Sequence, residues 1–258
     1  MGRRLGQHFL FDPAILDRIV DALHPDPDDF VVEIGAGRGT LTRRLAPRVG
    51  SVLTIERDES LASALRDELA GNCTVVAADA LEVEWAAGRD PAQPYKVVGN
   101  IPYAITTPLI DKALDPPPPD LIVFLLQREV GDRLGASPGT KTYGGLTVGV
   151  QTAAAVERLF VVRPGSFRPP PKVDSVVVRL APLADPVVAS TDRPAFRRFV
   201  AGLFGQRRRQ LTRALRTVTG LSADEVEALL DQLGLDAAAR PEVITPHEFA
   251  MLFGAVPR

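Results

Sequence analysis

Three short groups of residues in this chain have the types and the spacing needed to bind a small ligand and act on a nucleobase. The first is the run EIGAGRG at residues 33–39, which lies between a predicted strand and a predicted helix. Its glycines allow the backbone to approach a ligand closely, and a helix start offers N–H groups without a partner inside the helix. The spacing is GxGxG and differs from the GxGxxG of dinucleotide-binding folds. A glycine-rich turn without a ligand is the alternative interpretation.

Two carboxylates form the second group. Glu56 ends the next predicted strand, where it can accept hydrogen bonds from both hydroxyls of a ribose. Asp79 follows the third predicted strand and can accept from the exocyclic amine of an adenine. Either acid alone is more often a solvated loop residue. Open α/β sheets bind ligands at the edge where the strands end, so suitable groups at consecutive strand ends favour one shared site.

The third group, Asn100, Ile101, Pro102 and Tyr103, follows the fourth predicted strand and indicates the reaction. An adenine amine is a poor nucleophile because its lone pair is delocalised into the ring. A site that methylates this amine must accept hydrogen bonds from its N–H groups and stack the base. The Asn100 side-chain oxygen and the Ile101 carbonyl are the predicted acceptors, while Tyr103 offers a stacking face. The alternative is an asparagine–proline turn that leaves a strand.

Alternating strands and helices are predicted to position these groups. Strand patterns cover residues 30–35, 51–56, 74–77, 95–99 and 121–126, and helical patterns cover residues 12–23, 40–49, 59–69 and 107–114. This alternation predicts an α/β fold, with a parallel sheet covered by helices on both faces. Residues 144–156 have a helical pattern, and two extended segments flank the proline-rich run at 167–172. After a linker at 181–192, the pattern is helical at 194–204, 206–219, 222–233 and 245–253.

The composition limits the kind of protein this is. The chain has 258 residues, of which 45% are hydrophobic, so it can bury a sizeable core. One cysteine and three histidines exclude an internal disulfide and argue against a metal centre. The longest apolar run, at 121–126, is far shorter than the roughly 20 residues of a membrane span, and no apolar signal-peptide core follows the basic start. We therefore expect a soluble cytoplasmic protein that does not enter a membrane.

Positive charge is concentrated near the C-terminus. The whole chain has a net charge of −2, yet residues 193–216 hold eight arginines and no acid. Local clusters of this kind bind phosphate backbones, and the predicted RNA contacts are Arg207, Arg208, Arg209 and Arg213. The alternative is a solvated helix face whose arginines pair with acids of the same domain, such as Asp224.

Together these motifs resemble the KsgA/RsmA-type ribosomal RNA adenine dimethyltransferases, and the glycine motif alone resembles the first motif of S-adenosylmethionine-dependent methyltransferases. The resemblance covers essentially the whole chain. It extends to residues 6–10, 127–130, 143–144, 167–177 and 240–246. Residue 8 is His where many relatives have Asn, and Ala104 stands where Asn or a larger residue is frequent, which leaves details of the pocket open.

The resemblance implies a Rossmann-like S-adenosylmethionine-dependent methyltransferase domain at 1–182 and a small all-α rRNA-binding domain at 183–258. It implies N6,N6-dimethylation of two adjacent adenosines near the 3′ end of 16S rRNA, within the 30S subunit or its precursor, by a monomer. The implied cofactor contacts are His8, Leu10, Gly35, Gly37, Glu56, Asp79 and Asn100. Phe167, beside the stiff run of prolines at 169–171, is either a second wall of the base-binding site or an ordinary packing residue.

Two other functions remain open at this stage. The 23S rRNA methyltransferases that confer macrolide resistance share the Asn-Ile-Pro-Tyr signature, but residues 127–130 and 240–246 favour the 16S enzyme. A ribosome-assembly factor that acts mainly by binding is a different class of function. It would be favoured if a variant at Asn100 still supported ribosome maturation.

Overall fold

The computed structural model describes residues 7–69 and 71–257, which form two compact units. The sheet unit contains the chain up to Gly131 together with Val156–Pro182, and the helical unit contains Asp132–Ala155 and the chain from Leu183 onward. The division after Pro182 falls at the sequence-predicted boundary. Residues 132–155 were predicted to belong to the sheet domain, but they belong to the helical unit. Tyr143 and Val148 pack into the core of that unit.

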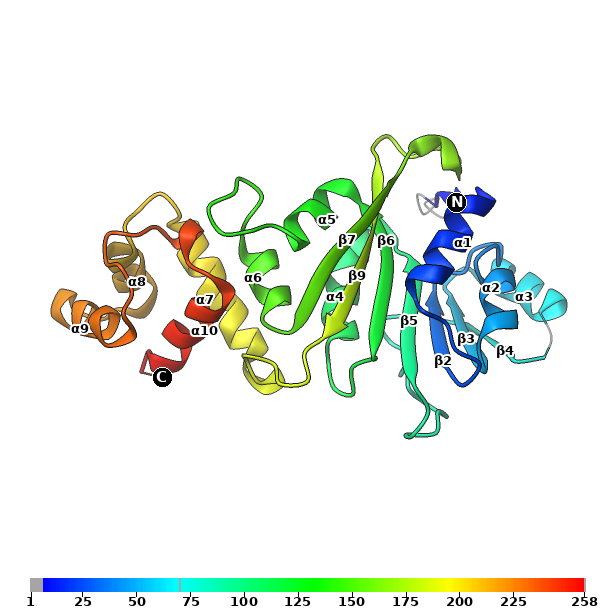
Figure 1. Cartoon of the computed structure of the whole chain (residues 1–258), viewed down its shortest axis with the longest axis horizontal. Coiled ribbons are helices and arrows are strands. Elements are labelled where there is room, and N and C mark those ends of the chain that lie inside the picture. Colours follow the sequence, from blue (N-terminus) through cyan, green and yellow to red (C-terminus); the bar gives the residue numbers. More distant parts are fainter. Residues whose placement is uncertain (1–6, 70, 258) are drawn as a thin grey trace. The chain divides into compact units, whose positions relative to one another are not determined.

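A seven-stranded sheet forms the centre of the sheet unit, in the order β4-β3-β2-β5-β6-β9-β7 (Figure 1). Five of these strands are parallel, as predicted: β2 (Phe30–Ile34), β3 (Ser51–Glu56), β4 (Cys73–Ala77), β5 (Tyr95–Asn100) and β6 (Leu121–Gln127). The other two strands of this sheet are β7 (Ala154–Val162) and β9 (Ser175–Pro182), and β9 runs antiparallel to β6. The sheet is therefore mixed, with a Rossmann-like parallel part.

The strand order reverses at β2, which pairs with β3 on one side and with β5 on the other. Such a reversal opens a crevice at the carboxyl ends of the strands, where α/β sheets bind ligands. All five residues of β2 are buried, which shows that both faces of this strand are covered. On one face, α1 (Pro13–Ala22) and α2 (Thr42–Leu45) pack against residues such as Val31, Val52 and Val98.

A second, two-stranded sheet joins distant parts of the sheet unit. In it, β1 (Phe9–Leu10) pairs antiparallel with β8 (Phe167–Arg168), so that Leu10 lies opposite Phe167. Two further helices follow the strand ends, namely α3 (Glu59–Glu68) and α4 (Thr106–Ala113), and α5 (Arg128–Leu134) follows β6.

The helical unit is built from five α-helices of the described residues. They are α6 (Gly145–Gln151), α7 (Arg193–Gly205), α8 (Leu211–Thr219), α9 (Ala223–Leu233) and α10 (Pro246–Ala255). Two predictions are corrected here. The predicted helix at 144–156 ends at Gln151 because β7 begins at Ala154, and the predicted helix at 206–219 begins only at Leu211.

Within the part of the chain that the structure describes, no helix combines the length and the apolar character needed to cross a membrane.

Candidate active site

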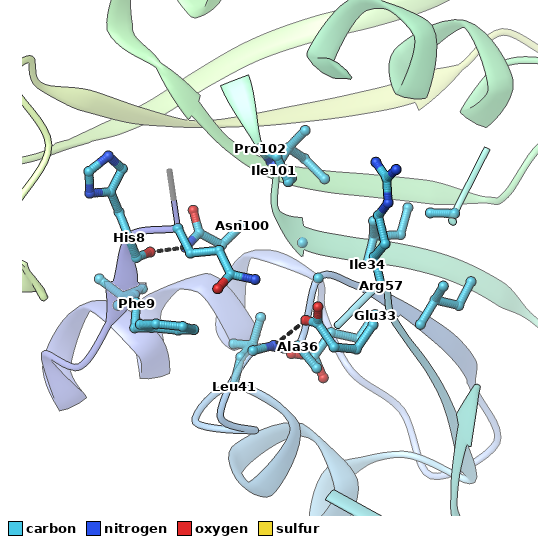
Figure 2. A pocket seen from close by; sticks show the side chains of 18 of the residues that line it. His8, Phe9, Glu33, Ile34, Ala36, Leu41, Arg57, Asn100, Ile101 and Pro102 are labelled. Atoms are coloured by element: carbon cyan, nitrogen blue, oxygen red, sulfur yellow. Dashed lines mark hydrogen bonds between the residues drawn. The ribbon is translucent and has the colours of Figure 1, made fainter. Parts of the chain in front are cut away.

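A cavity of about 480 Å³ lies in the sheet unit at the carboxyl ends of the parallel strands (Figure 2). It contains nearly all of the residues that the sequence predicts to bind a cofactor or act on a base, although they come from five separate segments. The predicted residues that line it are His8, Leu10, Gly35, Gly37, Glu56, Asp79, Asn100, Ile101, Pro102 and Tyr103. Gly6, which begins the N-terminal motif, lies outside the described residues.

The glycine loop after β2 lines this cavity and has a left-handed backbone at two positions. Gly35 and Gly37 have φ values of 71° and 58°, a region that side chains other than glycine rarely adopt. A Cβ atom at Gly37 would also lie only 2.9 Å from the ring of Phe9, which packs against the loop. Glycine is therefore required at this position both for its conformation and for the space that Phe9 occupies.

Glu56 holds the glycine loop from the end of β3. Its side chain is 4% exposed. One carboxylate oxygen accepts from the backbone N–H of Gly37 at 2.8 Å, and the other accepts from that of Asp58 at 2.9 Å. A carboxylate offers about four acceptor positions, so each oxygen keeps capacity for one ligand hydroxyl. Glu56 thus holds the loop, which the sequence alone did not indicate, and keeps acceptor capacity toward the cavity.

Asp79 lies two residues beyond β4 and is oriented by its own turn. Its Oδ1 atom accepts from the backbone N–H of Leu81 at 3.0 Å, and its Oδ2 atom lies 3.4 Å from Arg57. Arg57 also lines the cavity and was missed in the sequence, although it directly follows Glu56. The ion pair places the Asp79 carboxylate at the cavity wall, where it can accept from an amine.

Asn100 is the last residue of β5, and its amide group has a defined orientation. The Nδ2 group donates to the backbone carbonyl of His8 at 2.9 Å (Figure 2). Because the nitrogen is engaged, the Oδ1 atom is the acceptor that Asn100 offers to a ligand. The preceding Gly99 allows this close packing, since a Cβ there would lie 2.6 Å from the carbonyl oxygen of Ile34.

Tyr103 lines the same cavity and is anchored through its hydroxyl. Its hydroxyl lies 3.1 Å from the Ser175 hydroxyl, and its ring centroid lies 6.0 Å from that of His8. The His8 ring in turn bonds through Nδ1 to the carbonyl of Pro169 at 2.8 Å. Ser175, a buried residue at the start of β9, belongs to the site as a positioning group that chemical reasoning from the sequence did not identify.

Phe167 is placed differently from its proposed role as a second wall of the base-binding site. Its side chain is only 2% exposed and belongs to the core cluster that also contains Leu16 of α1. Phe167 is not among the residues that line the cavity. In this structure it packs as the alternative interpretation described, in the same core cluster as residues of α1.

Glu33 adds a buried carboxyl group to the cavity. Its Oε2 atom has no hydrogen-bond partner among the described residues. Burial, with a further contribution from the nearby Glu56 carboxylate, raises the pKa of Glu33 from 4.5 to about 7. The folded protein therefore retains a proton that the unfolded chain releases at lower pH.

This retained proton predicts a pH dependence of stability. The contribution of Glu33 to the free energy of unfolding is fully present below about pH 4.5 and is lost as the pH rises through about 7. Between pH 5 and pH 8 the ligand-free protein should lose up to about 3 kcal/mol of unfolding free energy through this group. Glu33→Gln should remove that part of the loss in urea unfolding. Glu59→Gln, at an exposed carboxylate of α3, is the matched control; equal pH dependence of Glu33→Gln and the wild type would contradict the prediction.

The four arginines predicted to bind RNA lie in the helical unit, all exposed, in or next to α8. Arg207 forms an ion pair with Glu242 at 3.2 Å. Arg208, Arg209 and Arg213 make no ion pair within residues 7–69 and 71–257. The alternative, pairing with acids of the same domain, thus holds for Arg207, whereas none of the four pairs with an acid of α9 in the described part of the chain.

The cavity fits S-adenosylmethionine in its chemical groups. The glycine loop allows close approach of a ligand, Glu56 keeps acceptor capacity for ribose hydroxyls, and Asp79 is available to an adenine amine. The unpartnered oxygen of buried Glu33 adds a place for a positively charged or hydrogen-donating group. S-adenosylmethionine carries all three of these groups, namely ribose hydroxyls, an adenine amine and a positively charged group.

Comparison with known proteins identifies relatives along nearly the whole chain. The family model described as ribosomal RNA adenine dimethylase matches residues 2–255. A protein of Geobacter metallireducens called ribosomal RNA small subunit methyltransferase A is 41% identical, covering 98% of this chain and 94% of that protein. A protein of the same description from Xanthomonas campestris is 45% identical over 84% of this chain and 83% of its own length.

Two solved structures share the fold. A dimethyladenosine transferase from Plasmodium falciparum has a TM-score of 0.81 and 27% identity, covering 95% of this chain and 96% of its own. The 23S rRNA methyltransferase ErmE has a TM-score of 0.73 and 31% identity, covering 97% of this chain and 100% of its own. Both the sheet unit and the helical unit therefore have counterparts in proteins that modify RNA or adenosine.

Proposed function

The chain belongs to the ribosomal RNA adenine dimethylase family, and from this membership and the geometry of the cavity we propose that it is an S-adenosylmethionine-dependent rRNA adenine N6,N6-dimethyltransferase. Its substrate is the small-subunit rRNA, in agreement with the curated relatives, rather than the 23S rRNA named for the structural neighbour. We further propose that it acts as a monomer in the cytoplasm, on two adjacent adenosines near the 3′ end of 16S rRNA within the 30S subunit or its precursor.

One observation supports the chemistry above all others, namely the oriented amide of Asn100 beside Tyr103 in the cavity. When bound, S-adenosylmethionine supplies an electrophilic methyl group. The Asn100 Oδ1 atom and the Ile101 carbonyl accept hydrogen bonds from the target amine, which localises its lone pair for attack. Tyr103 stacks on the base and, anchored to Ser175, fixes its plane. The chain contributes positioning and hydrogen bonding, and no covalent intermediate with the protein is required.

Methyl transfer from labelled cofactor tests this function. We expect incorporation into immature 30S particles, with the product mapped as dimethyladenosine at two adjacent positions. Naked 16S rRNA and 50S subunits serve as comparison substrates. Modification of 50S alone would indicate the 23S activity, and binding to 30S without any methylation would favour the assembly-factor alternative.

The helical unit is proposed to bind rRNA phosphates through Arg208, Arg209 and Arg213. Replacing Arg208 and Arg209 with alanine should weaken binding to 30S and make its salt dependence shallower by up to about one phosphate contact per arginine. The affinity for the cofactor should not change, because the cavity lies in the sheet unit.

Arg207→Ala provides a matched comparison in the same segment. Arg207 is paired with Glu242, so its loss should lower the melting temperature. The salt dependence of 30S binding should stay close to that of the wild type. Salt titrations and melting curves on both variants separate RNA contact from structural pairing. An unchanged slope in the double variant would contradict the proposed RNA contact.

A further inference from the structure

An exposed aromatic–arginine pair lies outside the cavity on the sheet unit. Phe11 is 42% exposed, an unusual exposure for a phenylalanine, and the guanidinium carbon of Arg168 lies 4.6 Å from the centroid of its ring. The mechanism described above uses neither residue. We call Phe11 and Arg168 the outer stack.

The outer stack is adjacent in the chain to residues of the site. Phe11 follows Leu10, which lines the cavity, and Arg168 precedes Pro169, whose carbonyl bonds to His8. In the β1–β8 pair, Leu10 and Phe167 are buried, whereas Arg168 is exposed. The outer stack therefore presents its surface to solvent directly beside the segments that border the cavity.

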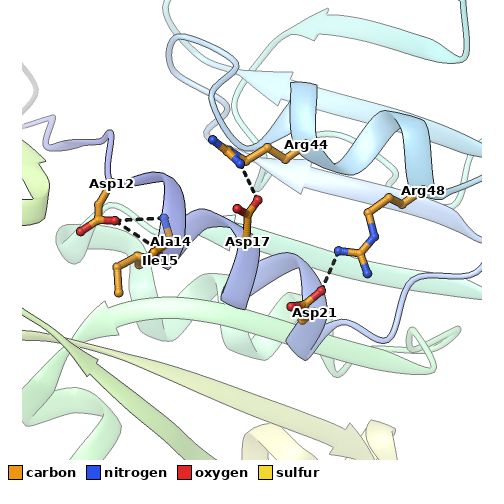
Figure 3. Close-up of polar contacts among 7 residues, drawn as sticks. All are labelled: Asp12, Ala14, Ile15, Asp17, Asp21, Arg44 and Arg48. Carbon is orange, nitrogen blue, oxygen red and sulfur yellow. Dashed lines mark hydrogen bonds and ion pairs between the residues drawn. The ribbon is translucent and has the colours of Figure 1, made fainter.

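The backbone under the outer stack is held in place. The N–H of Phe11 donates to the carbonyl of Ser166 at 3.1 Å, and the Ser166 hydroxyl lies 3.2 Å from the Asp12 carboxylate. Asp12 also caps α1 by accepting from the backbone N–H groups of Ala14 and Ile15 (Figure 3). A flanking nucleotide would therefore meet a surface that is already organised.

Further cationic side chains belong to the loop that carries Arg168. Arg163 and Arg128 both form ion pairs with Asp174, at 3.0 and 3.2 Å. Arg163 is 77% exposed, and Lys172 is exposed in the same loop. An aromatic face with an arginine over it, bordered by cations, has the chemistry of a site for a stacked base and its phosphates.

We propose that the outer stack holds the nucleotide next to the adenosine in the cavity, with the base stacked on Phe11 and Arg168 and the phosphates near Arg163 and Lys172. This inference rests on the proposed function, in which two adjacent adenosines are modified. While one of them is in the cavity its neighbour needs a place outside, and the outer stack is positioned to provide it. The outer stack thereby takes part in presenting the two adenosines.

Variants of the outer stack test this role on immature 30S particles at saturating cofactor. Phe11→Leu removes the aromatic face and keeps an apolar side chain. Arg168→Ala removes the guanidinium group that lies over this ring, at an exposed position. Each should raise the particle concentration that gives half-maximal rate by roughly tenfold. Phe11→Tyr should stay near the wild type. Arg48→Ala removes an exposed arginine that pairs with Asp21 near the far end of α1, and it should leave the rate unchanged (Figure 3).

Cofactor affinity and melting temperature, measured on the same variants, should stay at wild-type values. The inference is overturned if Phe11→Leu and Arg168→Ala both behave like the wild type. It is also overturned if Phe11→Tyr loses as much as Phe11→Leu, since the side chain would then act through packing alone. A wild-type protein that methylates no 30S particle would instead contradict the proposed function, so the two failures are distinguishable.

Discussion

Replacement of Asn100 by alanine is expected to reduce the single-turnover rate of methyl transfer by about 10²–10³-fold. The loss of one hydrogen bond that acts on the reacting group has effects of this order. The side-chain oxygen of Asn100 is the acceptor that we propose for the amine, because its nitrogen is already bonded to the His8 carbonyl. Binding of 30S particles should change far less than the rate.

Asn100→Asp separates the two roles of this side chain. It keeps the acceptor oxygens but loses the N–H that donates to His8, so its carboxylate would face a carbonyl oxygen. We expect a reduced rate for this variant too. A rate near the wild type in Asn100→Asp would show that the contact with His8 is dispensable, and a nearly unchanged rate in Asn100→Ala would refute the proposed activation of the amine.

Replacement of Glu56 by alanine is expected to weaken binding of S-adenosylmethionine by at least ~100-fold in calorimetric titration. Two charge-assisted hydrogen bonds to the ribose would be lost, each worth about 1.5–3 kcal/mol. The structure adds a second reason, because the same carboxylate holds the N–H groups of Gly37 and Asp58. The glycine loop should therefore lose its fixed conformation together with the ligand contacts.

The control for this effect is Glu59→Ala, which removes an exposed carboxylate three residues further on. It should leave the affinity for the cofactor unchanged, provided that the site depends on local geometry rather than on the total charge. Circular dichroism should show that both variants are folded. Unchanged affinity in a folded Glu56→Ala protein would remove Glu56 from the site.

The parallel part of the sheet was predictable because its strands are short apolar runs that end in polar or glycine-rich turns. The observed β3, Ser51–Glu56, has the predicted bounds. The region from 144 to 162 was not predictable in the same way. Its apolar residues fit a helical spacing up to 156, whereas the chain forms α6 and then enters β7, which pairs with β9 in the sheet. Local patterns carry no information about that partner.

The candidate site, too, could be predicted from the sequence only in part. The side chains at the strand ends could be found in the sequence, because parallel strands bring their carboxyl ends to one edge. The burial of Phe167 depends on where α1 packs, and the anchoring of Tyr103 depends on Ser175 of a distant strand. Such contacts are determined by tertiary packing and have no signature in local spacing.

The pairing of β1 with β8 has a consequence for how the protein matures during its own synthesis. Phe9 and Leu10 are synthesised long before their partners Arg168 and Phe167, which come after most of the sheet unit has been made. Contacts this remote in sequence form late, because a long loop must close before they are gained. The His8 carbonyl that orients Asn100 belongs to the same segment. A nascent or truncated chain with its parallel strands in place would therefore still lack an oriented Asn100, and catalytic competence would be among the last properties that the folding chain acquires.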